Sequence, residues 1–282
     1  MKLARVLVAT SRPLSWVNTA YPFAVAYFVS TGRIDLPLIV GTLFFLVPYN
    51  LAMYGINDVF DYESDLVNPR KGGLEGAVVA PRFHRPILWA SFIACAPFGA
   101  YLVMAGDGPS NAVLALSMFA VIAYSVKGLR FKERPFLDSV TSSVHFVSPA
   151  LYGIVLAHSA VNTAQWLVLT AFFLWGVGSH AFGAVQDVVS DRDGGIRSIA
   201  TVIGAAWTVR FAVVAYALAG FALALTPGIV PWLPPVAALY ILVTIQWWNV
   251  TDENSSDANR GWKRLLLLNF VAGAAVTMAL MG

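Results

Sequence analysis

Four acidic residues and one asparagine fall within the nine-residue stretch NDVFDYESD, residues 57–65. Asp58, Asp61 and Asp65 stand at positions i, i+3 and i+7, which places three carboxylates on one face of a helix, with Asn57 at its border. The uncharged run GTLFFLVPYNLAMYGI comes directly before them, so they lie at the C-terminal end of an apolar helix. The helix dipole is negative there and disfavours carboxylates. Such a group requires compensation by protons or by cations.

A second acidic group has the same character. In QDVVSD, Asp187 and Asp191 are four residues apart at the end of another apolar segment, and Asp193 follows two residues later. If the two groups face one another, their carboxylate and amide oxygens suit a hard cation such as Mg²⁺ that shares the oxygens of a phosphate. The sequence has neither the glycine spacing of a calcium loop nor a Cys and His set for zinc. A solvated loop would also tolerate acidic residues, but two matched groups favour a functional site.

The loops beside these groups carry complementary charge. Lysine and arginine residues follow each acidic group and occupy the loop KGLRFKERP; they are Arg70, Lys71, Lys127, Arg130, Lys132, Arg134, Arg192 and Arg197. The tendency of cytoplasmic loops to be basic accounts for such residues equally well. Carboxylates that bind Mg²⁺ and are surrounded by Lys and Arg nevertheless form the usual environment of a diphosphate. The sequence therefore predicts a site for a molecule with a diphosphate head and an apolar tail.

The composition indicates which elements must position this site. The 282 residues are 58% hydrophobic and 12% charged, with a mean hydropathy of +0.70, whereas a soluble domain is about 25% charged. We therefore predict an all-α polytopic membrane protein, with one membrane domain over residues 1–282. Nine apolar segments form the predicted bundle: Leu14–Ser30, Leu36–Ile56, Ile87–Ala105, Pro109–Val126, Phe136–Ala157, Ala164–Val189, Thr208–Leu225, Ile229–Trp248 and Leu265–Met281.

The basic residues also predict the orientation. With the N-terminus in the cytoplasm, 17 of the 18 Lys and Arg residues fall on the cytoplasmic side, and Arg33 falls on the other. Both acidic groups then lie at the cytoplasmic face of the cell membrane. The first residues are basic like a signal peptide, but Arg12 and Pro13 interrupt any apolar core. We expect a retained tail that lies on the membrane as an amphipathic helix. Cys95 lies in an apolar segment, where we expect it only to pack.

The two acidic stretches resemble the paired motifs of a known family. NDVFDYESD is similar to the Asn-Asp-x-x-Asp-x-x-x-Asp motif of the UbiA superfamily of intramembrane prenyltransferases, and DVVSD resembles its second motif, Asp-x-x-x-Asp. Nine helices with both motifs at cytoplasmic ends extend the resemblance over the whole chain. Five stretches also look like the lycopene elongases of C50 carotenoid biosynthesis: SRPLSWVNTAYPF, PYNLAMYGINDVFDYESD, NPRKGGLEGAV, RFKERPFLD and GAVQDVVSDRD.

The resemblance implies a reaction and a role for each of these residues. Mg²⁺ would be held on the diphosphate of the donor, dimethylallyl diphosphate, by Asn57, Asp58, Asp61, Asp65, Asp187 and Asp191. The other diphosphate oxygens would be bound by Arg70, Lys71, Lys127, Arg130 and Arg192. Diphosphate would then leave, and a terminal double bond of lycopene would attack the allyl cation. Loss of a proton or capture of water would finish the step, and repetition at the other end would give a C50 product.

Four rings stand near the predicted site. Tyr54 lies one turn deeper than the first acidic group, and Tyr124 lies at the end of the fourth segment. Either ring face could stabilise an allyl cation by about 0.5–2 kcal/mol, or could be an ordinary interfacial tyrosine. His180 faces the second acidic group and could accept the final proton, or could be a hydrogen-bonded structural histidine. The same alternatives apply to His145 near the middle of the fifth segment.

Two alternative functions remain open. The same chemistry could act on a quinone precursor, a chlorophyllide, a haem or a glycerolipid. A polar acceptor should need an anchor such as an arginine, and the predicted spans hold Lys or Arg only at their cytoplasmic ends, which favours an apolar acceptor. A divalent-cation transporter would use the acidic groups differently. It should need polar groups that continue to the outer side of the membrane, but the outer halves of these segments contain almost no polar residues.

Overall fold

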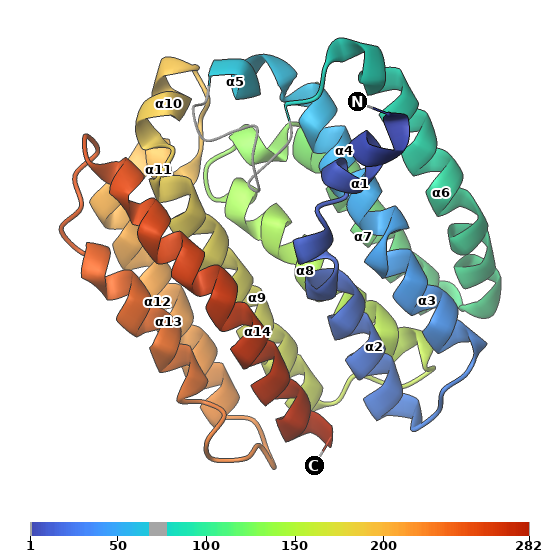
Figure 1. The fold of residues 1–282 in the computed structure, drawn as a ribbon. Coiled ribbons are helices and arrows are strands. Elements are labelled where there is room, and N and C mark those ends of the chain that lie inside the picture. The colour runs from blue at the N-terminus through green and yellow to red at the C-terminus, as the bar shows by residue number, and fades with distance from the viewer. Residues whose placement is uncertain (1, 68–77, 282) are drawn as a thin grey trace. The chain divides into compact units, whose positions relative to one another are not determined.

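The computed structural model describes residues 2–67 and 78–281, and within these residues it contains helices and no strand (Figure 1). The predicted all-α class is confirmed for this part of the chain. Two compact units are distinguished, Met1–Arg130 with His145–Ala160 and Phe131–Val144 with Val161–Gly282, and each has its own core. The single domain expected from the sequence stays a prediction.

The first unit contains the N-terminal helices and the second part of α8. Two short 3-10 turns, Pro13–Ser15 and Pro81–Phe83, precede α2 and α6. The helices are α1 Leu3–Thr10, α2 Val17–Thr31, α3 Leu36–Leu46, α4 Pro48–Phe60, α5 Tyr62–Val67, α6 His84–Ala105, α7 Gly108–Ser125 and α8 Leu137–Leu156.

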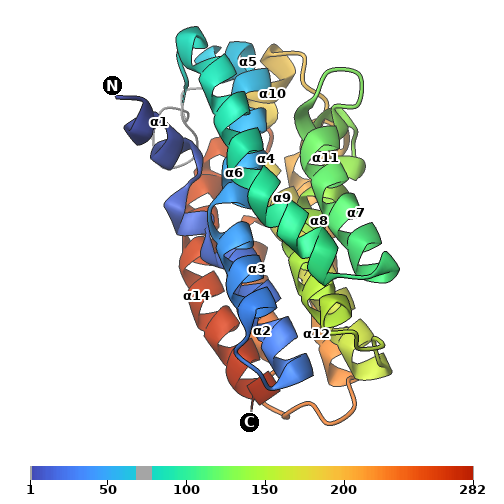
Figure 2. The ribbon, with the colours of Figure 1, turned by 90° about the vertical axis from the view of Figure 1, so that its right-hand side faces the viewer.

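An aromatic cluster forms the centre of the first unit. Phe23 of α2 lies 5.2 Å from Phe45 of α3 and 5.9 Å from Tyr152 of α8, and Phe45 lies 5.1 Å from Tyr49 of α4, measured between ring centroids. All four rings are fully buried. Gly41 of α3 lies against the Phe23 ring, and a Cβ at this position would overlap the ring carbons. With α6 packed on α3 and α4 (Figure 2), this cluster fixes the helix that carries the first acidic group.

The second apolar segment, predicted as one helix, is broken in the middle. Because proline has no N–H to continue the hydrogen-bond ladder, α3 ends at Leu46 and α4 begins at Pro48. The buried Asn50 side chain repairs the break: its Nδ2 donates to the carbonyl oxygens of Phe45 at 2.8 Å and Leu46 at 3.1 Å, and to Thr19 Oγ1 at 2.7 Å. The Phe45 and Leu46 carbonyls at the break are thus satisfied without water.

The second unit contains the beginning of α8 and the C-terminal helices. α9 packs on α12 through small residues, since a Cβ on Gly178 would lie 3.2 Å from both the Ala212 carbonyl oxygen and the Ala215 side chain. Phe182 and Tyr216 lie in the core that results. The elements are the turn Phe131–Glu133, α9 Thr163–Val185, α10 Val188–Asp193, α11 Ile199–Ile203, α12 Ala205–Ala224, α13 Val236–Thr244, the turns Ile245–Trp247 and Ser255–Ala258, and α14 Asn259–Met281.

Seven helices of the described residues are long and apolar enough to cross a membrane, fewer than the nine predicted segments. The first predicted segment falls on α2, which has only 15 residues, and the eighth falls on the shorter apolar stretch Val236–Trp247. The eighth segment was predicted to begin at Ile229, but the helix begins at Val236, after the prolines at positions 231, 234 and 235. The number of nine spans and the orientation of the N-terminus stay predictions.

Other predicted boundaries are wrong by about one to two turns. The sixth segment was expected to end at Val189, but α9 ends at Val185 because the chain turns at Gln186 and Asp187. The ninth helix begins at Asn259, ahead of the predicted apolar run. The tail does form the expected helix, α1.

Replacing Asn50 by Leu tests the repair of the α3–α4 break. The variant keeps the volume but removes the side-chain donor from the Leu46 carbonyl, at about 1–3 kcal/mol for a buried group, whereas the Phe45 carbonyl still accepts from Thr19 Oγ1 at 2.7 Å. We expect the melting temperature of the protein in detergent to fall by at least about 5 °C, as measured by tryptophan fluorescence. Asn249→Leu, at an exposed position, serves as the control. Equal melting temperatures for both variants would contradict the assigned role.

Candidate active site

The first acidic group spans the junction of α4 and α5. α4 ends at Phe60 and α5 begins at Tyr62, yet the helical hydrogen bonds continue across the junction. The Asp61 N–H donates to the Asn57 carbonyl at 2.9 Å, and the Asp65 N–H donates to the Asp61 carbonyl at 2.8 Å. Asp61, Asp65 and Asp58 are all buried. The carboxylates therefore share one helical repeat, as the spacing predicted.

Two arginines approach this group from other elements. Arg12 forms an ion pair with Asp58, 2.8 Å from Nη2 to Oδ1, with 19% of the arginine side chain and none of the aspartate side chain exposed. Arg130, from the loop after α7, lies 4.0 Å from Asp61 Oδ1. Burial is the largest single effect and lowers the pKa of Arg12, but the attraction and hydrogen bond of Asp58, together with Tyr54 and Asp65, outweigh it, so the pKa of Arg12 is raised. The protein's own arginines therefore supply part of the positive charge that the buried carboxylates were expected to need.

Arg12 was not assigned a role from the sequence. Its guanidinium also lies over the Tyr54 ring, 4.2 Å from the centroid. The chain turns sharply at this residue, with φ 50° and ψ 75°, before Pro13 starts the next turn. The nearest signal in the sequence is its place in the stretch SRPLSWVNTAYPF, which carries part of the family resemblance. No local periodicity connects it to an acidic group 46 residues later in the chain.

The end of α7 contributes the remaining partners in the first unit. Ser125 Oγ donates to Asn57 Oδ1 at 3.0 Å, which orients the amide beside the acidic group. The Tyr124 ring meets the His145 ring edge-on, with 5.3 Å between centroids. Lys127 lies in the same loop as Arg130, but it is exposed. The structure therefore gathers Tyr54, Asn57 and Arg130 with the three aspartates, and places Tyr124 and His145 together beside the end of α7.

The second acidic group, in the other unit, also lies where a long apolar helix is followed by a short helix. α9 ends at Val185, the chain turns, and Asp187 directly precedes α10. The Asp191 N–H donates to the Asp187 carbonyl at 2.8 Å, so both residues follow one helical repeat, and both side chains are half-buried. Asp193 is exposed.

Arg192, which was predicted to bind diphosphate, forms an ion pair with Asp252. Its Nη1 donates to Asp252 Oδ2 at 2.5 Å, and its Nε and Nη2 donate to the Thr201 carbonyl. Asp252 Oδ1 accepts from the Ala205 N–H at 2.7 Å. Burial opposes the charge of Asp252, but these donors outweigh it and lower its pKa. Arg192 thus joins α10 to α11 and to the loop before α14.

A buried polar chain leads to His180 of α9. Asp138 Oδ1 accepts from the Ser139 N–H at 2.7 Å, and Asp138 Oδ2 accepts from the Ile199 N–H at 2.7 Å. Ser139 Oγ lies 3.0 Å from His180 Nδ1. Asp138 was not predicted to be a functional residue, although it ends the stretch RFKERPFLD. These hydrogen bonds fix the orientation of the imidazole ring. A structural histidine and a positioned base would both require this.

Each acidic group carries the hard oxygen donors that suit Mg²⁺. The described residues contain no group of three or more His, Cys, Asp or Glu side chains arranged to hold a metal ion. Each acidic group provides hard oxygen donors next to backbone turns, and Mg²⁺ commonly completes its shell with water and substrate phosphates. The residues therefore fit a metal that is shared with a diphosphate. Arg70 and Lys71 lie outside the described residues.

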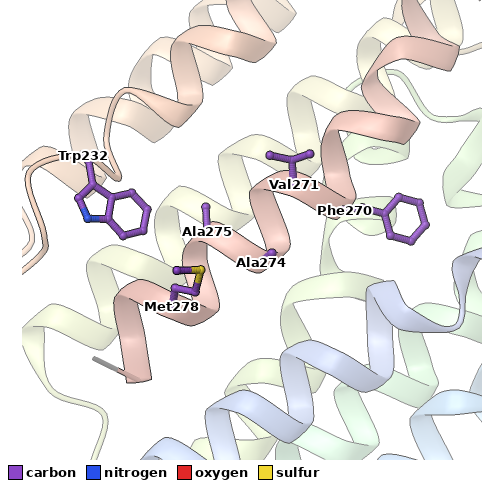
Figure 3. A pocket seen from close by; sticks show the side chains of 6 residues that line it. All are labelled: Trp232, Phe270, Val271, Ala274, Ala275 and Met278. Atoms are coloured by element: carbon purple, nitrogen blue, oxygen red, sulfur yellow. The ribbon is translucent and has the colours of Figure 1, made fainter.

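A hollow elsewhere in the second unit does not suit this chemistry. It measures about 660 Å³ and lies along α14, where Trp232, Phe270, Val271, Ala274, Ala275 and Met278 line it (Figure 3). None of these side chains can ionise, so the hollow cannot hold a diphosphate.

Residues 19–271 match the model of the UbiA prenyltransferase family. A "Lycopene elongase/hydratase" of Corynebacterium glutamicum is 50% identical over 99% of this chain and 98% of its own length. A "C(50) beta-cyclic carotenoids biosynthesis protein" of Dietzia sp. is 53% identical over 98% of this chain, which spans 64% of that longer protein. Among solved structures, a UbiA homologue of Archaeoglobus fulgidus bound to DMAPP and Mg²⁺ has a TM-score of 0.67 at 17% identity, over 95% of this chain and 99% of that chain.

The contact between Arg192 and Asp252 can be tested by a double-mutant cycle. Arg192→Gln and Asp252→Asn should each lower the melting temperature by about 1–4 °C, because a partly exposed pair contributes about 0.2–1 kcal/mol. The double variant should lose no more than the worse single variant. Asp257→Asn, in a more exposed pair, is the control. Additive losses would show that the two side chains act separately.

Proposed function

The chain belongs to the UbiA prenyltransferase family, and from that premise we propose that it is a Mg²⁺-dependent lycopene elongase of the cell membrane. The family predicted from the two acidic motifs is thereby confirmed. The proposed enzyme transfers C5 units from dimethylallyl diphosphate to the two ends of lycopene and forms C45 and C50 carotenoids. The observation that carries the donor chemistry is the buried row of Asp58, Asp61 and Asp65 with arginines beside it.

The acceptor is proposed from the relatives. Near-complete alignment at 50% identity with a protein named for lycopene elongation and hydration supports lycopene over a quinone precursor or a glycerolipid. The apolar helices agree with a polyene acceptor, since such a molecule offers no charge for an anchor to bind. The orientation proposed from the basic loops places the donor site at the cytoplasmic face.

The acidic groups would bind the metal–diphosphate head of the donor. The ligands proposed for Mg²⁺ are Asn57, Asp58, Asp61, Asp65, Asp187 and Asp191. When bound, the metal would supply positive charge to the diphosphate oxygens as the C–O bond breaks. Arg130 is placed to add to this charge, because it already lies near Asp61. Lys127, Arg192, Arg70 and Lys71 complete the proposed basic set.

The allyl cation left behind needs an electron-rich surface that excludes water. Tyr54 has one ring face occupied by the Arg12 guanidinium, so only its other face is available to a second cation. Tyr124 meets His145 through a ring edge, in an edge-to-face pair. Both tyrosines are proposed to line the path of the C5 unit. His180, oriented by Ser139, is the proposed acceptor of the proton when the product cation is not captured by water.

Reconstitution tests the proposed reaction. Purified protein in lipid, supplied with Mg²⁺, dimethylallyl diphosphate and lycopene, should give products heavier by one and then two C5 units in mass spectrometry. Chelation of the metal should abolish them. Product formation with a quinone precursor, and none with lycopene, would reject the acceptor while keeping the family chemistry.

Isosteric substitutions test the metal ligands in the same assay. Asp58→Asn and Asp187→Asn should each reduce turnover by about 10³-fold or more, because a neutral amide removes charge from the site where the leaving group is stabilised. The matched control is Asp193→Asn, at the exposed aspartate beside the second group, and it should keep near-normal turnover. Folding is checked by gel filtration in detergent. Near-normal turnover by either motif variant would reject its assignment as a ligand.

A further inference from the structure

Arg12 is held at the first acidic group with part of its hydrogen-bonding capacity unused. Nη2 donates to Asp58 Oδ1 at 2.8 Å and the guanidinium stacks on Tyr54. Nε is buried and has no hydrogen-bond partner among the described residues. We propose that Arg12 is a further diphosphate-binding residue, which Asp58 and Tyr54 hold in position and which donates its Nε–H to an oxygen of the donor. This inference rests on the function proposed above.

The chemistry of the guanidinium supports this role. It carries five N–H donors in a planar fork and stays charged at any ordinary pH, so it can bind a carboxylate with one edge and a phosphate oxygen with another. A buried N–H without an acceptor is unfavourable, and an arriving anion would satisfy it with a charge-assisted hydrogen bond. A lysine ammonium has no planar fork, so it could not present one fixed edge to Asp58 and another to the anion.

The backbone around Arg12 is fixed in place by its neighbours. Its positive φ of 50° is uncommon for a residue with a side chain and persists only where the surroundings enforce it. Trp16 Nε1 donates to the Ser11 carbonyl at 3.0 Å, which closes the turn. Val6 of α1 packs with Ile87 of α6, which attaches the tail helix to the unit. Strain of this kind at a ligand site is consistent with a preorganised binding residue.

A simpler role would be charge compensation alone. In that case Arg12 would only neutralise Asp58 until a metal arrives, and it would compete with the metal for the carboxylate. Removal of Arg12 would then leave binding of a metal–diphosphate complex unchanged or make it tighter. A diphosphate-binding residue predicts the opposite sign. The two roles are therefore separated by a binding measurement that needs no turnover.

The probe is inorganic pyrophosphate with Mg²⁺, titrated calorimetrically into the full-length protein in lipid nanodiscs. We expect Arg12→Gln to bind it about 10-fold to 100-fold more weakly than the unchanged protein, as the loss of a charge-assisted hydrogen bond requires. Arg12→Lys should fall between the two, because it keeps the charge and loses the fork. Arg5→Gln, on the exposed face of α1, is the matched control and should bind normally. Binding by Arg12→Gln as tight as the unchanged protein, or tighter, would overturn the inference.

Two further outcomes are distinguishable. If the unchanged protein itself fails to bind pyrophosphate with Mg²⁺, the proposed donor site is rejected and the inference with it. If Arg12→Gln does not fold, as judged by gel filtration and thermal unfolding, Arg12→Lys decides the question: unweakened binding by that variant would overturn the proposed fork. In the reconstituted reaction, the same variants should raise the KM for dimethylallyl diphosphate, whereas the KM for lycopene should stay constant.

Discussion

Negative charge buried at the end of α4 is the constraint on which the first unit depends. A buried carboxylate costs several kcal/mol unless a cation or hydrogen bonds compensate it, and the negative end of the α4 dipole increases that cost. Arg12 in the N-terminal segment and Arg130 after α7 compensate part of this negative charge. The aromatic cluster around Phe45 and the attachment of α1 to α6 hold these distant segments at one helix end.

Both acidic motifs lie where an apolar helix gives way to a short polar one. α4 stops at Phe60 and α9 stops at Val185. Asp61 and Asp187 lie in the turns that follow, and Asp65 and Asp191 lie in the helices of six residues that come next. The helical hydrogen bonds pass through the first turn at Asp61. In the second turn the Asp187 N–H donates to the Ala184 carbonyl, three residues earlier, and the helical repeat starts again from the Asp187 carbonyl. Each motif therefore keeps its carboxylates on one repeat while the chain leaves the apolar segment. In a single continuous helix, the last carboxylate of the motif would instead lie further along the axis of the apolar helix.

The sequence predicted what is local and missed what is distant. Spacing within residues 57–65 determines a helical face regardless of the surroundings, so the first acidic group was predictable. Arg12 was not, because only tertiary packing brings it to Asp58, and Asp138 was missed for the same reason. Pro48 itself indicates a break in the helix, but the mean hydropathy of the segment does not reveal it, because the residues on both sides are apolar. The side chain that makes the break tolerable, Asn50, looks like an isolated polar residue in an apolar run.

The use of arginine at Asp58 limits how the site can respond to a ligand. A lysine or histidine could release a proton when a metal approaches, whereas a guanidinium keeps its charge. Diphosphate alone would meet three buried carboxylates, and Mg²⁺ alone would meet Arg12 and Arg130. A metal–diphosphate complex presents charge of both signs, so its metal can face the carboxylates while its free oxygens face the arginines. The charges of the site therefore complement the complex better than either of its parts.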